Sequence, residues 1–185
     1  MAECGAGKDA AAGAGQVARE LGEDARTLSA RDFEARHGSG FLLLSTAALD
    51  RPEGPAATRV ELDDFEAAAS EDTAGISLRI YPVVRSERSV GHLVTVGRTS
   101  NNDIVIPDLS VSRFHAFLKP VGAGRFHIQD AKSTNGSTVN GVSVPAQGNG
   151  APLELTSGDD LRFGQVQLTF LDAHALWEFL RAHEF

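Results

Sequence analysis

The polar residues of the C-terminal half gather in three short segments whose residue types suit the binding of a phosphate dianion. The segments are residues 97–104, 110–115 and 130–137. They supply arginine, whose fork of donors can grip two phosphate oxygens, and hydroxyls that can donate to the remaining oxygen. They also supply asparagine, whose amide carries a donor and an acceptor and can clamp a peptide main chain. A phosphothreonine carries about −1.5 to −2 charges near neutral pH and three strong acceptor oxygens, so this chemistry fits recognition of a phosphopeptide.

The same segments offer no convincing catalytic pair. The sequence contains no glycine-rich nucleotide loop, no nucleophile elbow and no two-histidine metal motif. Its six histidines follow no ligand spacing, and the single cysteine, Cys4, excludes a multi-cysteine zinc site. We therefore expect a binding protein that is not an enzyme and needs no cofactor and no metal.

The elements around these segments predict an all-β fold, an antiparallel β-sandwich. Short β-rich stretches alternate with Gly and Asn turns, and no helix between them is long enough for a crossover. The expected strands lie at 76–84, 93–96, 104–106, 115–120, 125–129, 153–155, 160–163 and 166–171. The loops at one end of a sandwich provide a rigid frame for a site, so we expect the polar segments to lie there.

The flanking regions predict a small helical or irregular N-terminal extension and a C-terminal helix. An Ala/Gly-rich tail that buries little should be flexible, and a small helix–strand element with an acidic linker should follow it. Ser29 would cap the helix of that element and Gly38 would end it, while Asp172 would cap the C-terminal helix. In order, the tail, the small element with its linker, the sandwich and the C-terminal helix are residues 1–28, 29–75, 76–172 and 173–185.

The charge distribution argues against two common classes of partner. The chain of 185 residues has a formal net charge of −8, from 17 Lys and Arg and 25 Asp and Glu. Residues 1–75 carry 7 of the basic and 15 of the acidic residues, so residues 76–185 carry 10 of each. An acidic chain without a basic stripe does not suit nucleic acid or an anionic membrane. Without a signal peptide or an apolar stretch long enough to span a bilayer, we expect a cytoplasmic protein.

Taken together, the motifs resemble a forkhead-associated (FHA) domain of the bacterial type, a β-sandwich that binds phosphothreonine. Any one motif is weak, but the ordered set over residues 78–171 is specific. In order, the motifs are Gly97-Arg98, Asn102-Asp-Ile104, Ser112-Arg-Phe-His115, Asp130, Ser133-Thr-Asn-Gly136, Val139-Asn-Gly141, Gly158-Asp159 and Phe163-Gly164. One departure is Ser137, where the family more often has threonine.

The resemblance implies a ligand-binding role for five residues. Arg98 would bind the phosphate, and Ser112 would donate its hydroxyl to the same group. Thr134 would add a contact near the phosphate, and Asn135 would hold the ligand main chain just beyond the phosphothreonine. Arg113 would provide a further contact.

Four other residues would support the binding loops rather than touch the ligand. They are Gly97, His115, Gly136 and Asn140. Asn135 and Asn140 each precede a glycine, a pair that is also typical of a hairpin turn. For Asn140 we favour the turn-and-brace role, and for Asn135 we favour the ligand contact.

The resulting hypothesis is a module that recruits or regulates a partner phosphorylated on threonine by a Ser/Thr protein kinase. The alternative is a phospho-independent scaffold, which would have no use for both Arg98 and Ser112. The ligand could also be the chain's own N-terminal segment, in which Thr58 is the candidate for phosphorylation.

Overall fold

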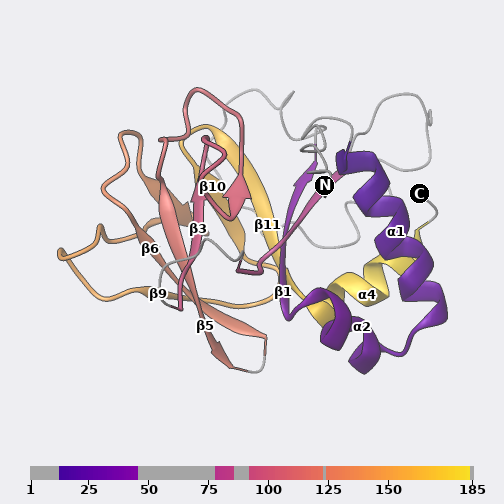
Figure 1. The fold of residues 1–185 in the computed structure, drawn as a ribbon. Coiled ribbons are helices and arrows are strands. Elements are labelled where there is room, and N and C mark those ends of the chain that lie inside the picture. Colours follow the sequence, from indigo (N-terminus) through magenta and orange to yellow (C-terminus); the bar gives the residue numbers. More distant parts are fainter. Residues whose placement is uncertain (1–12, 46–77, 86–91, 123, 184–185) are drawn as a thin grey trace, which may run out of the picture.

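Two β-sheets pack face to face, and helices cover part of the outer face of one of them (Figure 1). The computed structural model describes residues 13–45, 78–85, 92–122 and 124–183. The larger sheet has the strand order β2-β1-β11-β10-β7-β8, and the smaller has the order β4-β3-β5-β6-β9. The fold is therefore a β-sandwich, as the sequence predicts.

The larger sheet is antiparallel throughout. In sheet order its strands are β2 (Leu78–Pro82), β1 (Gly40–Ser45), β11 (Val166–Asp172), β10 (Asp160–Phe163), β7 (Ser137–Val139) and β8 (Val142–Ser143). The strands β7 and β8 are too short to be recognised in the sequence, where their residues read as turns.

The smaller sheet departs from the prediction in one respect: β3 and β4 pair in parallel. In sheet order its strands are β4 (Ile104–Val105), β3 (Val94–Gly97), β5 (Ala116–Gly122), β6 (Arg125–Asp130) and β9 (Leu153–Leu155). The parallel pair is only two residues long, because β4 itself consists of two residues.

The strand β1 lies inside the larger sheet rather than in a separate N-terminal element. Its residues pair with β2 on one side and with β11 on the other. Leu42 and Leu44 face the sandwich core, while Phe41 and Leu43 face the helices. Burial on both faces explains why the run Phe41-Leu-Leu-Leu44 lacks polar alternation. A boundary at residue 76 would therefore divide one sheet.

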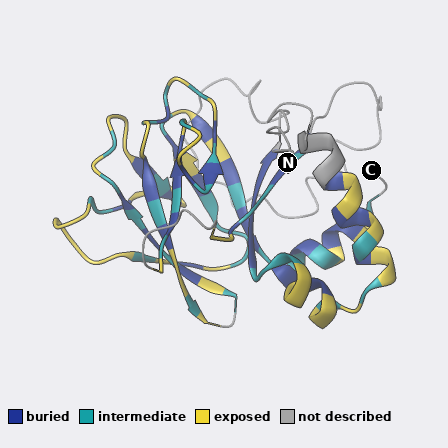
Figure 2. Ribbon diagram, viewed as in Figure 1, coloured by how far each residue is buried: buried dark blue, intermediate teal, exposed yellow. Residues whose placement is uncertain are grey.

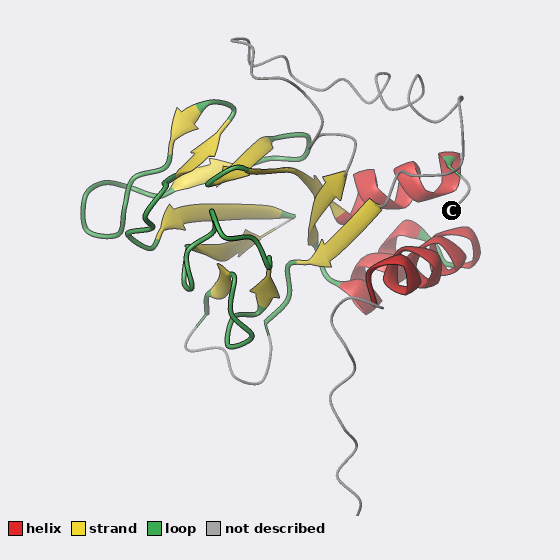
Figure 3. Ribbon diagram, turned by 90° about the horizontal axis from the view of Figure 1, so that it is seen from above, coloured by secondary structure: helices red, strands yellow, loops and turns green. Residues whose placement is uncertain are grey.

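Among the described residues, three helices pack on the outer face of the larger sheet and form the helical cap, visible at one side of the strands in Figures 1 and 3. They are α1 (Gly13–Thr27), α2 (Ala30–His37) and α4 (Ala173–Ala182). The cap has an apolar core of its own, centred on Phe33 and Leu176, which are both fully buried. In Figure 2 the exposed positions of these helices lie mainly on the sides that face away from the sheet.

Helix α1 corrects the expectation that residues 1–28 form a flexible tail. Ala18, Leu21 and Ala25 are spaced by three and four residues, so they share one helix face, and all three are buried. The glycines around them hide this pattern in the sequence. Residues 1–12 and the acidic linker at 46–77 lie outside the described part of the chain.

The ends of the two shorter helices follow the capping residues that the sequence indicates. Ser29 Oγ accepts a hydrogen bond from Asp32 N at the start of α2, and Gly38 ends that helix with φ at +96°. Asp172 accepts from Ala175 N at the start of α4. The indole of Trp177 on α4 donates to Leu28 O just beyond α1, so the connection between α1 and α2 is bonded to α4. No helix in the described ranges is long and apolar enough to cross a membrane.

Candidate functional site

Ser112 connects the three loops that carry the predicted ligand contacts. The loops are residues 98–103 between β3 and β4, residues 106–115 between β4 and β5, and residues 131–136 between β6 and β7. Arg98 N donates to Ser112 O over 3.0 Å, and Thr134 N donates to Ser112 Oγ over 2.9 Å. These three loops, called the binding loops below, therefore meet at one end of the sandwich.

Two arginines extend from these loops into solvent. Arg98 directly follows the last residue of β3, and Arg113 follows Ser112; both side chains are exposed. Within the described ranges, neither guanidinium takes part in a hydrogen bond or an ion pair. No carboxylate of the described residues neutralises their charges, so both can bind an anionic ligand.

The hydroxyls of Ser112 and Thr134 lie beside each other, 3.4 Å apart. Ser112 is half-buried and Thr134 is exposed. The backbone of Arg98 is bonded to Ser112, so the hydroxyl pair and the Arg98 side chain arise from adjoining points of the structure. This is the combination of donors that a phosphate group requires.

The amide nitrogen of Asn135 makes a hydrogen bond within the protein, while its amide oxygen is available to a ligand. Its Nδ2 donates to Ser110 O over 2.8 Å, which joins the third binding loop to the second. Its Oδ1 makes no hydrogen bond to any described residue. The side chain is exposed, so this oxygen can accept from a peptide N–H.

His115 holds the second and third binding loops from beneath. Its ring is fully buried, and Nδ1 accepts a hydrogen bond from Ser112 N over 2.9 Å. Since Nδ1 accepts, the proton lies on Nε2, which donates to Gly136 O over 3.1 Å. Burial lowers the pKa of His115. The hydrogen bond to Gly136 O and the charge of Asp130 act to raise this pKa, but burial has the larger effect. The neutral ring is therefore the form that fits the structure.

Asp130 stabilises the third binding loop and is not placed to act on a ligand. Its buried carboxylate accepts from Ser133 N (2.8 Å), Ser133 Oγ (2.7 Å) and Ser137 Oγ (2.7 Å). Burial alone would raise the pKa of Asp130, but these hydrogen bonds and His115 bring it below its usual value. Ser137 thus keeps the hydroxyl that threonine more often supplies at this position.

Two glycines allow the binding loops to take their shape. A Cβ at Gly97 would lie 2.3 Å from Arg113 O, so only glycine lets these two loops approach so closely. Gly136 has φ at +74°, a conformation that disfavours side chains.

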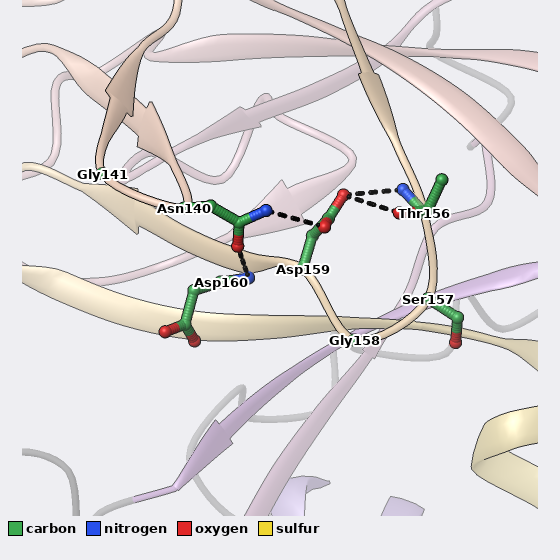
Figure 4. A pocket seen from close by; sticks show the side chains of 7 residues that line it. All are labelled: Asn140, Gly141, Thr156, Ser157, Gly158, Asp159 and Asp160. Carbon is green, nitrogen blue, oxygen red and sulfur yellow. Dashed lines mark hydrogen bonds between the residues drawn. The ribbon is translucent and has the colours of Figure 1, made fainter. Parts of the chain in front are cut away.

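Asn140 forms the predicted turn and braces a neighbouring segment, but its hydrogen bonds lie at the end of β7 opposite to the binding loops. Asn140 follows the last residue of β7, whereas Gly136 precedes the first, so four residue steps of about 3.3 Å separate them by roughly 13 Å. Asn140 Nδ2 donates to Asp159 Oδ1, and Asn140 Oδ1 accepts from Asp160 N (Figure 4). With φ at +49°, Asn140 forms a turn that closes a shallow hollow of about 400 Å³ at the opposite end of the strand.

Asn102 contributes a contact whose function the sequence does not show. The side chain is buried, and its Nδ2 donates to Arg113 O (2.7 Å) and Thr99 O (2.9 Å). It therefore joins the first binding loop to the second.

Ser110 is a second residue whose role the sequence does not show. Its N and Oγ both donate to Asp108 Oδ1, and its Oγ accepts from Gln165 N in the β10–β11 turn. A serine two residues after an aspartate is a known turn signal, but it does not reveal which distant segment the turn contacts.

Part of the sandwich is similar to a known protein family. The FHA domain matches residues 94–164. The ABC transporter ATP-binding/permease protein Rv1747 of Mycobacterium tuberculosis is 34% identical over 110 residues, which are 57% of this chain and 12% of that protein. The oxoglutarate dehydrogenase inhibitor of Corynebacterium glutamicum is 35% identical over 77 residues, 42% of this chain and 49% of that protein.

A third relative is the glycogen accumulation regulator GarA of Mycolicibacterium smegmatis. It is 35% identical over 77 residues, which are 42% of this chain and 44% of that protein. The chain thus spans about an eighth of the transporter and less than half of either regulator. The helical cap lies outside the family match.

Proposed function

We propose that the chain is a non-catalytic module of the bacterial FHA type that binds threonine-phosphorylated segments of partner proteins; the match of residues 94–164 to the FHA domain supports this. The phosphate would bind where Arg98, Ser112 and Thr134 meet. Arg113 would add a second positive charge, and Asn135 would hold the ligand main chain.

The observation that carries this proposal is the group of donors around Ser112, whose hydroxyl donates only a long hydrogen bond, 3.4 Å, to Thr134 Oγ1. The guanidinium of Arg98 makes no bond to the described residues, while its backbone is fixed to Ser112. The hydroxyls of Ser112 and Thr134 lie 3.4 Å apart at the same point. The loops are already rigid, so little conformational entropy would be lost when a phosphate binds.

The partner class follows from this chemistry and from the names of the relatives. An inhibitor and a regulator are among the proteins similar to this chain. We therefore propose that binding recruits or regulates a partner that a Ser/Thr protein kinase has phosphorylated. The proposal places the protein in the cytoplasm, where ATP is available for that phosphorylation.

A second candidate ligand is the chain's own N-terminal segment, and the sheet register supports it. Ser45 at the end of β1 pairs with Leu78 at the start of β2. Leu43 pairs with Thr169, so Ser45 lies near the start of β11, next to the β10–β11 turn that contacts Ser110. Both ends of the 46–77 segment thus leave the sheet at the end that carries the binding loops. Thr58 itself lies outside the described residues.

Calorimetric titration of the full chain tests the proposal. The probes are a degenerate phosphothreonine peptide pool, its unphosphorylated twin and its phosphoserine twin. Replacing Arg98 by alanine should lower affinity for the phosphothreonine pool by about 2–5 kcal/mol, which is roughly 30-fold or more. The matched control is Arg125→Ala, an exposed arginine in a salt bridge with Glu154 near the opposite end of the sandwich. This variant should bind as the unchanged protein does.

Two outcomes would contradict the proposal. Equal binding of the phosphorylated and unphosphorylated pools would favour the phospho-independent scaffold. Phosphate-dependent binding that survives Arg98→Ala would place the ligand elsewhere on the molecule.

A further inference from the structure

Leu109, in the second binding loop, is an apolar side chain that lies almost wholly in solvent. It is 90% exposed, more than any other large apolar residue of the described ranges that reaches the surface. The others are Val142 at 60%, Val84 at 45% and Phe114 at 40%. Leu109 therefore contributes little to the core, and its side chain is available to a ligand.

The backbone on both sides of Leu109 is fixed. Asp108 O accepts from Val111 N, closing a turn, and Asp108 Oδ1 accepts from both Ser110 N and Ser110 Oγ. Val111 is buried in the sandwich core. The turn also fits closely against Gly164, where a Cβ would lie 2.4 Å from Ser110 O. Leu109 is thus held by a rigid turn. Little conformational entropy of the loop would therefore be lost when a ligand binds.

The position of this turn relates Leu109 to the part of the site that holds the ligand main chain. Asn135 Nδ2 donates to Ser110 O, so the residue directly after Leu109 is bonded to the proposed main-chain clamp. Ser112, with its hydroxyl at the proposed phosphate site, is three residues further along the same loop. A peptide held by Ser112 and Asn135 would therefore pass beside Leu109.

We propose that Leu109 is a specificity-determining residue, which contacts an apolar side chain within a few residues of the ligand's phosphothreonine. The proposal rests on the proposed function and narrows the partner class to threonine-phosphorylated segments with an apolar residue close to the phosphate. A leucine side chain has no hydrogen-bonding group, so it gains only by removing apolar surface from water. The cations of Arg98 and Arg113 attract the phosphate, whereas Leu109 discriminates among the phosphorylated segments that are attracted.

Two phosphothreonine peptide pools test this proposal with the full chain. In one pool, the three positions on each side of the phosphothreonine are drawn from Leu, Ile, Val and Met. In the other, they are drawn from Ser, Asn and Gln. Each pool is titrated into the unchanged protein, into Leu109→Ser, and into the matched control Val142→Ser. Val142 is 60% exposed and lies in the β7–β8 hairpin, near Asn140 and away from the binding loops.

We expect the effect of Leu109→Ser on affinity to depend on which peptide pool is titrated. Leu109→Ser should weaken binding of the apolar pool by about 10-fold, which corresponds to about 1.4 kcal/mol. It should leave binding of the polar pool unchanged, and Val142→Ser should change neither. Because Leu109 is exposed, its replacement should not alter the unfolding midpoint, which separates a lost contact from a damaged fold.

Three results are distinguishable from the expected one. If Leu109→Ser binds both pools as the unchanged protein does, this inference is wrong while the proposed function stands. If Leu109→Ser weakens both pools equally, the residue shapes the loop and does not select ligands, which also overturns the inference. If the unchanged protein binds neither pool more tightly than the unphosphorylated twins, the proposed function itself fails.

Discussion

The binding loops and the helical cap differ in what holds them in place. Buried polar side chains hold the loops in place by hydrogen bonds. They are His115, Asp130 and Asn102, which bond to backbone groups or hydroxyls of neighbouring loops. In the cap, apolar side chains such as Phe33 and Leu176 pack on the outer face of the larger sheet. The loops keep the guanidinium groups of Arg98 and Arg113 exposed and without partners among the described residues, whereas the cap is held by buried apolar contacts. We expect changes in the loops to alter binding first and changes in the cap to alter stability first.

The largest expected effect comes from removing the N-terminal part of the chain. A chain that begins at residue 76 lacks β1, so β2 and β11 lose the strand between them. It also lacks Leu42 and Leu44 from the sandwich core and α1 and α2 from the cap. We expect this chain to show no cooperative unfolding transition when it is followed by circular dichroism. A cooperative transition with a midpoint close to that of the full chain would show that the cap and β1 are dispensable.

A change inside the cap should lower stability and spare binding. Phe33 is fully buried, with its ring centroid 6.1 Å from that of Phe41 and 4.8 Å from that of His37. Phe33→Ala should lower the free energy of unfolding by about 3–5 kcal/mol, since it leaves a cavity in a packed apolar core. Urea unfolding measures this loss, with the exposed Glu34→Ala on the same helix as the control. A large loss of phosphopeptide affinity in the folded variant would contradict the separation of the two regions.

A change in the binding loops should lower ligand affinity and have little effect on stability. Ser112→Ala removes the proposed hydroxyl donor to phosphate and the acceptor of Thr134 N. We expect phosphopeptide affinity to fall about 10-fold. The free energy of unfolding should fall by only about 1 kcal/mol, the net worth of a typical hydrogen bond. Calorimetry and urea unfolding of the same sample give both values, and a stability loss as large as that of Phe33→Ala would be inconsistent with this account.

The smallest expected effect is a dependence of stability on pH that begins in the loops. The pKa of His115 is lowered in the folded protein, chiefly by burial, so the unfolded chain binds a proton first as the pH falls below about 6.5. The stability that the neutral ring contributes is present above that pH and is lost as the pH falls through the folded-state pKa. Urea unfolding between pH 7.5 and 5.5, with an NMR titration of the His115 ring, measures this. A His115 pKa above 6.5 would refute the assignment.

The ionised carboxylate of Asp130 also contributes stability that is lost as the pH falls, but at lower pH than for His115. Hydrogen bonds hold the pKa of its carboxyl below the usual value of about 3.8, so its contribution is lost only as the pH falls below that value. Between pH 5.5 and 4.5 the further loss of stability should therefore owe little to this group.

The difference between the two regions also explains what could be predicted from the sequence. The binding loops lie between recognisable strands, and their motifs occur in a fixed order, so Arg98, Ser112, Thr134 and Asn135 could be placed together in advance. The position of Asn140 could not, because an Asn-Gly pair indicates a turn without indicating at which end of the sandwich it lies. The contacts of Ser110 and Asn102 were also missed, since they depend on segments distant in the sequence.

The cap was harder to predict because its packing is non-local. The glycines of α1 suggest a flexible tail, and only the buried face of Ala18, Leu21 and Ala25 makes it a stable helix. In the same way, nothing in the run from Phe41 to Leu44 shows that its partners are β2, more than 30 residues later, and β11 near the end of the chain.

The most direct test of the central claim is an NMR titration of the ¹⁵N-labelled full chain with a phosphothreonine peptide. We predict that the amide signals that shift will cluster in the binding loops, at residues 97–99, 109–113 and 133–136. Signals from α1, α2 and α4 should stay in place, and the unphosphorylated peptide should move none of them. Shifts centred on the helical cap, or equal shifts with both peptides, would contradict the claim that the binding loops hold a phosphothreonine.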